Sequence, residues 1–207
     1  MPTHAQPHRS CRARRRLEML LRVSDVLEQT ADDVDPAGRQ IDDLLAAAGI
    51  ARSTFYLHFR DKAELLDALG EHVFGEFLDV AGFWWALEAP VTRPDVREAM
   101  ERLCDAYRVR RGTVSAVVDA AANDTGLRDR YRRLVHEVVG ALEAAIVAGQ
   151  LTGTIDASLD ARGTATWIAW MIERGMTQLV MPADANATDR LLQTLTDLVW
   201  NALYAPA

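Results

Sequence analysis

Residues 41–69 read IDDLLAAAGIARSTFYLHFRDKAELLDAL, and this stretch decides the fold. It divides into three short amphipathic helices separated by two tight breaks. The first helix is predicted over Ile41 to Ala48, with Leu44 and Leu45 on its apolar face. Gly49 ends it, because glycine reaches the left-handed backbone conformation that a sharp turn requires. The middle helix is too short and too polar to exist for packing alone, so we predict that it is the working part.

The middle helix is predicted over Arg52 to Phe59, and it can bury only one side. Phe55 and Phe59 lie four positions apart on that side. The opposite side carries polar side chains and no acid, namely Arg52, Ser53, Tyr56 and His58. A guanidinium can bond two acceptors on a guanine edge, and hydroxyl or imidazole groups suit phosphate oxygens. The exposed side therefore indicates contact with nucleic acid.

A capping pattern marks the start of the third helix. Asp61 is the predicted N-cap, and Glu64 three positions later completes a capping box. Lys62, the only lysine in the chain, then lies in the first helical turn, where the helix dipole disfavours a cation. Its position indicates a phosphate contact, with a solvated surface lysine as the alternative.

These residues resemble the helix-turn-helix of TetR-type transcriptional repressors. The resemblance is carried by the groups Ala48-Gly49-Ile50, Ser53-Thr54-Phe55-Tyr56, His58-Phe59, Asp61-Lys62 and Leu65-Leu66. It implies that Arg52 and Ser53 face bases, while the DNA backbone is contacted by Thr54, Tyr56, His58 and Lys62. One departure is Gln40, which stands where the family commonly has a Ser or Thr to cap the following helix.

Charge is distributed unevenly along the chain. The net charge of −7 would by itself argue against nucleic acid as a partner. Residues 1–16, however, contain five arginines and no acid, whereas residues 71–207 contain 13 basic and 19 acidic residues. We predict a flexible basic arm over residues 1–13 and DNA contacts from Arg14 and Arg15. Two interpretations of the arginine run stay open: a disordered solubilising tail, or an arm that follows the DNA backbone or enters a minor groove.

The N-terminal segment lacks the apolar core of a secretory signal, and no run approaches the ~20 apolar residues of a membrane span. We therefore expect a cytoplasmic protein without membrane contact. Cys11 and Cys104 are then expected to be reduced thiols. His4, His8 and Cys11 lack a fourth ligand, so no metal site is predicted, and no cofactor is expected.

The remaining pattern is helical with no convincing strand, so the predicted fold class is all-α. We predict a three-helix DNA-binding domain over residues 14–69 and a larger helical effector-binding and dimerisation domain over residues 70–207. The first helix should run from Arg14 to Thr30, and the third helix of the motif should continue well past Leu69 and end, itself or as a kinked extension, before Pro90. Further helices are expected over Pro94 to Arg111, Thr113 to Asn123, Gly126 to Ala148 with a stop at Gly149, Leu159 to Val180, and Thr188 to Tyr204.

The last two predicted helices carry more apolar surface than the outer helices of one monomer normally expose. Either the chain's own helices bury this surface or a second copy does. A helix-turn-helix protein needs a two-fold dimer to grip two half-sites of a palindrome, so we favour a homodimer. The predicted interface residues are Leu191, Leu195, Leu198 and Ala202.

Aromatic residues of the second domain predict a pocket for a small apolar effector, with a filled core as the alternative. The candidates, which include one polar anchor, are Trp84, Trp85, Tyr107, Asn123, Trp167, Trp170 and Met171. The segments ATWIAWMIERGMTQLVM and TLTDLVWNALY are most similar to the ethionamide-resistance type of TetR regulator, which encloses an elongated apolar tunnel. Its asparagine positions correspond to Ala169 and Ile172, which implies a different anchor or a more apolar ligand.

The sequence contains no recognisable catalytic arrangement. None of its five histidines lies in a catalytic motif, and the pair Glu173-Arg174 fits a structural ion pair better than acid-base chemistry. We predict no enzyme, but a repressor that binds palindromic double-stranded operator DNA as a dimer and is released by its effector. The alternative is a helical ligand-binding protein without DNA-binding activity, but such a protein would have no need of Thr54, Tyr56 and Lys62.

Overall fold

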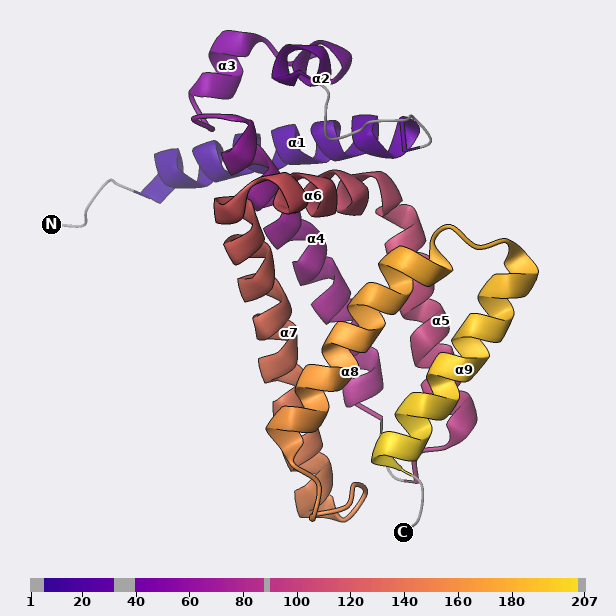
Figure 1. Ribbon diagram of the computed structural model, residues 1–207. Helices are drawn as coiled ribbons and strands as arrows, with labels where there is room; N and C mark the ends of the chain where they lie inside the picture. Colours follow the sequence, from indigo (N-terminus) through magenta and orange to yellow (C-terminus); the bar gives the residue numbers. More distant parts are fainter. Residues whose placement is uncertain (1–5, 32–39, 88–89, 205–207) are drawn as a thin grey trace, which may run out of the picture. The chain divides into compact units, whose positions relative to one another are not determined.

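The computed structural model describes residues 6–31, 40–87 and 90–204, and all regular structure in these residues is helical, which confirms the all-α prediction (Figure 1). The helices are α1 (Gln6–Gln29), α2 (Ile41–Ala47), α3 (Arg52–Tyr56), α4 (Lys62–Trp85), α5 (Arg93–Val109), α6 (Arg111–Asn123), α7 (Thr125–Thr152), α8 (Ala161–Gly175), the π-helical segment η1 (Met176–Val180) and α9 (Ala185–Leu203). They form two compact units. The N-terminal unit takes in the described residues up to His72 and Arg110–Arg128, and the C-terminal unit takes in Val73–Val109 and the described residues from Asp129.

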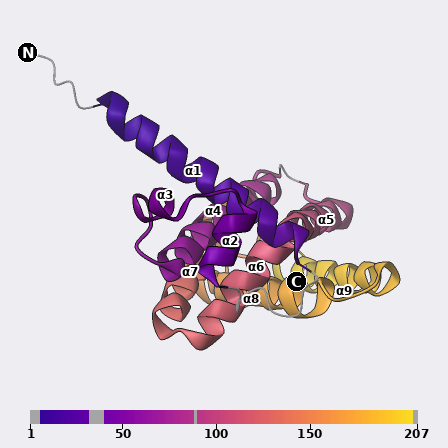
Figure 2. The ribbon, with the colours of Figure 1, turned by 90° about the horizontal axis from the view of Figure 1, so that it is seen from above.

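In the N-terminal unit, α1 runs alongside α2 and α6 (Figure 2). The core of the unit is apolar and tightly closed. Its most deeply buried side chains include Leu27, Leu44, Phe55, Leu65 and Leu69. The short helices α2 and α3 are therefore held by packing, because helices of 7 and 5 residues are not stable in isolation.

The contact between α1 and α6 leaves no room for a side chain on α6. A Cβ atom on Gly112 would lie 2.1 Å from the carbonyl oxygen of Leu27. The Glu28 carboxylate accepts hydrogen bonds from the backbone N–H groups of Gly112 at 2.7 Å and Thr113 at 3.0 Å, and from the Thr113 hydroxyl at 2.7 Å. That hydroxyl also lies 2.9 Å from the Ser24 hydroxyl. An acid of α1 thus caps the start of α6, where the helix dipole favours negative charge.

In the C-terminal unit, α5 packs along α9, and α8 continues through η1 toward α9. The Arg97 guanidinium bonds Glu101 on its own helix at 2.7 Å and Asp189 of α9 at 2.6 Å. Asp184 caps α9 by accepting a hydrogen bond from the N–H group of Ala187 at 2.8 Å. The capping residue explains why α9 begins at Ala185, three residues before the predicted start.

The end of α7 corrects a prediction. Gly149 does not stop the helix, which continues to Thr152. A Cβ atom on Gly149 would lie 2.7 Å from the Ile155 side chain, so this glycine makes room for a returning loop. Gly153, with φ +76°, is the residue that allows the chain to turn. Two glycines four residues apart therefore have different tasks, which sequence pattern alone does not separate.

Two other helix ends differ from the expectations. Helix α1 already begins at Gln6, so residues 6–13, expected to form a flexible arm, are helical, while residues 1–5 lie outside the described part. Helix α3 ends at Tyr56 rather than Phe59, because the chain turns there before Asp61 caps α4.

The compact units also depart from the predicted division, since α6 groups with the N-terminal helices. The functional division at residue 69 stays a prediction.

One helix, α7, is long and apolar enough to cross a membrane by length and composition alone. This is weak evidence, and it differs from the expectation that no run in the chain approaches a membrane span. The buried residues Val135, Val139, Leu142 and Ile146 recur every three or four positions along α7. That spacing is typical of one core-facing side of an amphipathic helix in a globular protein.

Candidate DNA-contact face and ligand cavity

The turn between α2 and α3 and the buried side of α3 hold this helix in a defined position. Gly49 has φ +63°, and the N–H group of Ile50 donates to the Leu45 carbonyl at 2.8 Å. These features match a left-handed residue after a helix, as predicted. Ile50 and Phe55 are buried, and the Phe55 and Phe59 rings stack at 5.5 Å. One side of α3 is therefore anchored in the core.

The opposite side of α3 is open. Arg52, Ser53, Thr54 and Tyr56 are exposed, while His58 and Lys62 are half-buried at its rim. The Arg52 guanidinium bonds Asp42 of α2 at 2.8 Å and lies 5.7 Å from the centre of the Tyr56 ring. Sequence reasoning found no acid on this face, because Asp42 comes from the preceding helix. The roles of these residues in DNA contact stay predictions.

Arginines of α1 lie at the end of α3. Arg12 donates to the Leu57 carbonyl at 2.8 Å, and the Arg16 guanidinium lies 4.8 Å from the centre of the Phe59 ring. The pKa of His58 is lowered by burial and, further, by the positive charges of Arg12, Arg15 and Arg16. The His58 Nδ1 atom is buried without a hydrogen-bond partner in the described residues.

The two α1 arginines that the sequence singled out differ in their surroundings. Arg14 makes an exposed ion pair with Glu18 at 3.5 Å, whereas Arg15 contributes to the positive field at His58. Arg12 and Arg16 contact the end of α3, and the sequence pattern marks them only as members of the arginine run. A helical spacing of three to four residues in this run was the signal that would have grouped Arg12, Arg15 and Arg16.

The start of α4 is capped as predicted, with one difference. The N–H group of Glu64 donates to the Asp61 carboxylate at 2.8 Å. The Glu64 carboxylate accepts from the backbone N–H and the Nε–H of Arg60, both at 2.9 Å, rather than from Asp61. These hydrogen bonds from Arg60 lower the pKa of Glu64. Lys62 is the first residue of α4.

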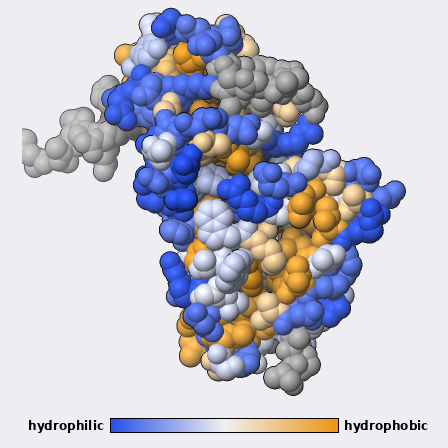
Figure 3. Space-filling model, in the orientation of Figure 1, coloured by the Kyte–Doolittle hydropathy of each residue, from blue (hydrophilic) through white to orange (hydrophobic). Residues whose placement is uncertain are grey.

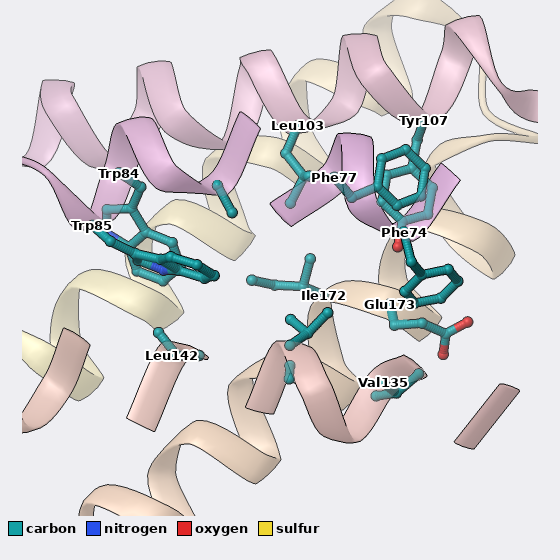
Figure 4. A pocket seen from close by; sticks show the side chains of 13 residues that line it. Phe74, Phe77, Trp84, Trp85, Leu103, Tyr107, Val135, Leu142, Ile172 and Glu173 are labelled. Carbon is teal, nitrogen blue, oxygen red and sulfur yellow. The ribbon is translucent and has the colours of Figure 1, made fainter. Parts of the chain in front are cut away.

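The C-terminal unit encloses a cavity of about 50 Å³ (Figure 4). Its walls are mostly apolar and come from α4, α5, α7 and α8. Trp84, Trp85 and Tyr107, predicted for the ligand pocket, line it. The indole rings lie at one end, and Tyr107 and Glu173 lie at the other. The cavity is far smaller than the ~300 Å³ typical of ligand pockets, so an effector must widen it.

A second, more open cavity of about 180 Å³ shares Trp84, Trp85 and Leu142 with the first. The two tryptophans therefore stand between the spaces. Trp84 donates its indole N–H to the Tyr204 hydroxyl at 3.2 Å. The Trp85 indole N–H is buried without a hydrogen-bond partner in the described residues.

Glu173 gives the first cavity a polar end that the sequence did not assign to the pocket. Its side chain is 3% exposed, and the Tyr131 hydroxyl donates to its Oε1 atom. Burial raises the pKa of Glu173, against the opposing effects of the Tyr131 hydrogen bond and of Arg174. The Arg174 Nε atom lies 3.0 Å from Oε2, so the predicted ion pair is present. Burial and the Glu173 charge together raise the pKa of Tyr107.

Four of the predicted pocket residues do not line this cavity. Trp167, Trp170 and Met171 line an outer groove formed by α8 and α9 and do not line the cavity, and Trp167 is 80% exposed. Asn123 is exposed, donates to the Asp119 carbonyl at 2.9 Å and belongs to the N-terminal unit. The cause is that aromatic composition predicts an apolar helix but does not predict which side of α8 faces the cavity.

Apolar side chains gather over α8 and α9 (Figure 3). Leu198, a predicted interface residue, is 51% exposed, and Ala202 is also exposed. Leu191 is half-buried, while Leu195 is already buried within one chain. Together with Trp167, these residues form what we call the α8–α9 face. Within the described part of the chain, no cluster of His, Cys, Asp and Glu side chains is suited to a metal ion.

Comparisons with known proteins agree with this arrangement. Residues 34–69 match the model for bacterial regulatory proteins of the tetR family, and residues 96–205 match the model for the C-terminal domain of the transcriptional regulator EthR. The chain is 26% identical over 167 residues to the HTH-type transcriptional regulator EthR of Mycolicibacterium smegmatis, which covers 79% of this chain and 76% of that protein.

Solved structures share the fold. A TetR-family transcriptional regulator from Pectobacterium atrosepticum matches with a TM-score of 0.72 and 18% identity, covering 96% of this chain and 99% of that one. The regulator FadR from Bacillus subtilis, solved in complex with stearoyl-CoA, matches with a TM-score of 0.71 and 17% identity, covering 91% and 99%. At these identities the likeness concerns the fold alone.

Proposed function

Because the chain belongs to the TetR family of transcriptional regulators and carries an EthR-type C-terminal domain, we propose that it is a ligand-responsive repressor. In this proposal it binds palindromic operator DNA in the cytoplasm as a homodimer and is released by a small apolar effector. The coarser statement, a DNA-binding transcriptional regulator with a ligand-binding domain, follows from the family itself. Regulation, rather than catalysis, is the activity that these matches indicate.

The observation that carries the proposal is the polar face of α3 beside the α1 arginines. Arg52, Ser53, Thr54 and Tyr56 are exposed on a helix whose other side is buried. The positive field of α1 at His58 supplies the sequence-independent attraction that DNA phosphates require. We propose base contacts from Arg52 and Ser53, and backbone contacts from the remaining predicted residues, including Arg14 and Arg15.

The size of this face supports a dimer. Helix α3 has 5 residues, so one copy reads few base pairs. A dimer supplies two α3 helices for two successive half-sites, which lie about 35 Å apart on DNA, and we propose that the copies pair through the α8–α9 face. The exposed Trp167 and Leu198 side chains give this face the apolar centre that a stable interface needs.

The cavity supports an apolar effector. Its lining is almost entirely apolar, so a ligand gains affinity chiefly by leaving water. Because the space is small in this structure, a ligand that widens it binds one conformation better than another. A ligand can release DNA only to the extent of that difference in affinity.

DNA binding is tested by fluorescence anisotropy on the region upstream of the protein's own gene. Replacing Tyr56 or Lys62 by Ala should weaken DNA binding. For Lys62→Ala, the slope of the logarithm of the binding constant against the logarithm of the salt concentration should also fall by about one. Arg52→Ala should relax specificity at one base step. Arg133→Ala, at an exposed position of α7, is the matched control and should bind as wild type. If the α3 variants also bound as wild type, the proposed face would be wrong. No binding by wild type would favour the ligand-binding protein without DNA-binding activity.

The dimer is tested by sedimentation at micromolar concentration. Wild type should be a dimer, and the double variant Trp167→Glu with Leu198→Glu should be a folded monomer, because both side chains are exposed in one chain. Leu151→Glu is the control, since Leu151 is 85% exposed but lies outside the α8–α9 face, and it should remain a dimer. A monomeric wild type, or a dimeric double variant, would contradict the proposed interface.

A further inference from the structure

The polar end of the cavity has a hydrogen-bonding requirement that the protein does not meet. Glu173 lines the cavity, is 3% exposed and comes from α8. The Tyr131 hydroxyl donates to Oε1, whereas Oε2 is buried without a hydrogen-bond partner in the described residues. Arg174 lies 3.0 Å from Oε2, but this ion-pair contact lacks the alignment of a hydrogen bond. A carboxylate can accept about four hydrogen bonds, so this one retains free acceptor capacity.

The remainder of the cavity wall near Glu173 is aromatic. Tyr107 stacks on Phe77 with ring centres 4.0 Å apart, and the Phe74 ring meets Tyr131 edge-on at 5.5 Å. These rings exclude water from the carboxylate, which makes a missing donor costly. Because Oε2 itself is buried, a ligand removes that cost only if it widens this end of the cavity and brings a donor to the carboxylate, whereas a purely apolar ligand leaves the cost in place.

The opposite end of the cavity has an unpaired hydrogen-bond donor instead of an unpaired acceptor. The Trp85 indole N–H is a donor without a partner, while the neighbouring Trp84 N–H is satisfied by Tyr204. Near Trp85 a ligand's donor hydrogen gains nothing, whereas an alcohol oxygen and an ether oxygen can both accept there, so only the Glu173 end distinguishes these two ligands. The cavity therefore has an orientation, with an acceptor at the Glu173 end and a donor at the Trp85 end (Figure 4).

We propose that Glu173 selects effectors that carry an O–H or N–H donor on an elongated apolar body, and that the donor binds at the Glu173 end of the cavity. This inference rests on the proposed function, because it names the chemistry of the effector for the same cavity. The donor can belong to an alcohol or to an amine, since both present a hydrogen to a carboxylate oxygen.

The test compares three probes of similar size: 1-octanol, its isomer methyl heptyl ether, and 1-octylamine. Binding to the full chain is measured by calorimetry, with indole fluorescence as a second readout. We expect 1-octanol or 1-octylamine to bind at least tenfold more tightly than the ether, because a hydrogen bond to a charged group contributes on the order of that factor. The stronger of the two donors identifies a neutral or a cationic head group.

Variants assign the preference to the carboxylate. Glu173→Gln keeps the shape but replaces one acceptor by an amide donor, so the ratio of donor to ether affinity should fall below about threefold. Glu137→Gln, the same change at an exposed position of α7 outside the cavity lining, is the matched control, and it should leave that ratio at tenfold or more. If Glu173→Gln does not fold, Tyr131→Phe replaces it: loss of the Tyr131 donor frees Oε1 for the ligand, so the ratio should rise, and a ratio that does not rise would contradict the role of Glu173.

The outcomes separate this inference from the proposed function. Equal binding of 1-octanol, 1-octylamine and the ether by wild type, no binding of any probe, or an unchanged ratio in Glu173→Gln would overturn the donor-selecting role. Each of these results is compatible with operator binding, which is measured independently by anisotropy. A donor preference in a chain that does not bind DNA would support the role of Glu173 and contradict the repressor proposal.

Discussion

The α1–α6 junction and the cavity are both buried, but they treat their polar groups in opposite ways. At the junction, Glu28 accepts three hydrogen bonds, and Gly112 allows the two backbones to touch. In the cavity, the Trp85 N–H and the Glu173 Oε2 atom have no hydrogen-bond partner in the described residues. At the junction the polar groups are hydrogen-bonded and the two backbones touch, whereas two polar atoms of the cavity wall lack a hydrogen-bond partner in the described residues.

This difference distinguishes a structural contact from the binding site that we propose. Buried polar groups are nearly always paired in folded proteins, so unpaired ones in a lined space call for a physical account. At the junction the pairing lowers the free energy of one arrangement of α1 and α6. In the cavity the unpaired atoms raise the free energy, and in our proposal a ligand lowers it by pairing with them, after the walls of the small space have moved.

The largest expected effect is at the junction. Gly112→Ala would place a methyl group against the Leu27 backbone, so the free energy of unfolding should fall by about 3 kcal/mol and Tm by about 6–12 °C. Thermal unfolding followed by circular dichroism measures this. Gly140→Ala, in the middle of α7 with no atom within 4 Å of the added Cβ, should instead stabilise the chain by about 0.5–1 kcal/mol. Equal effects of the two changes would show that the junction is not closed.

A smaller effect distinguishes filled core from cavity along α8. Ala165 and Ala169 are both buried, but only Ala169 lines the cavity. Ala165→Val should destabilise the chain by about 1–3 kcal/mol through overpacking, whereas Ala169→Val should cost less than about 1 kcal/mol because its methyl groups enter empty space. Urea unfolding measures both.

The same pair of variants separates ligand response from DNA binding. Ala169→Val should weaken 1-octanol binding by about tenfold or more, because the added methyl groups occupy the ligand's space, and it should leave operator affinity within about twofold. A destabilisation equal to that of Ala165→Val, with ligand binding intact, would mean that the ligand uses another site.

The smallest expected effect concerns pH at the end of α3. Burial and the charges of Arg12, Arg15 and Arg16 hold the pKa of His58 below its ordinary value of 6.5. The unfolded chain therefore takes up the proton first, so this contribution to stability is complete above pH 6.5 and is lost as the pH falls toward the lower folded-state pKa. Operator affinity should instead rise as the pH falls, because a protonated imidazole near phosphates favours the complex.

His58→Gln should remove both pH dependences. The measurements are urea unfolding and DNA anisotropy over pH 5.5–7.5, roughly the range in which an imidazole titrates. If operator affinity kept its rise at low pH in His58→Gln, another group would be responsible. If only the pH dependence of the free energy of unfolding remained in His58→Gln, a group elsewhere in the fold would be its cause.

Local pattern was sufficient for the helix-turn-helix and insufficient for the cavity. Gly49, the Phe55–Phe59 pair and the Asp61 cap act within a few residues of one another, so their spacing alone predicts the turn, the buried side and the helix start. The wall of the cavity combines four helices from distant parts of the sequence. For that reason composition selected Trp84, Trp85 and Tyr107, which line the cavity, together with Trp167, Trp170, Met171 and Asn123, which lie elsewhere.

What the sequence determined by itself is therefore the all-α class, the resemblance to TetR regulators and the polar side of α3, because each depends on short-range periodicity and turn chemistry. Only the tertiary structure decided that Asp42 pairs with Arg52, that the α1 arginines lie near His58, that Gly112 meets the α1 backbone, and that Glu173 lies in the cavity wall. These facts depend on how helices pack against one another, and the direction of a side chain around a helix has no meaning until a neighbouring helix is placed beside it.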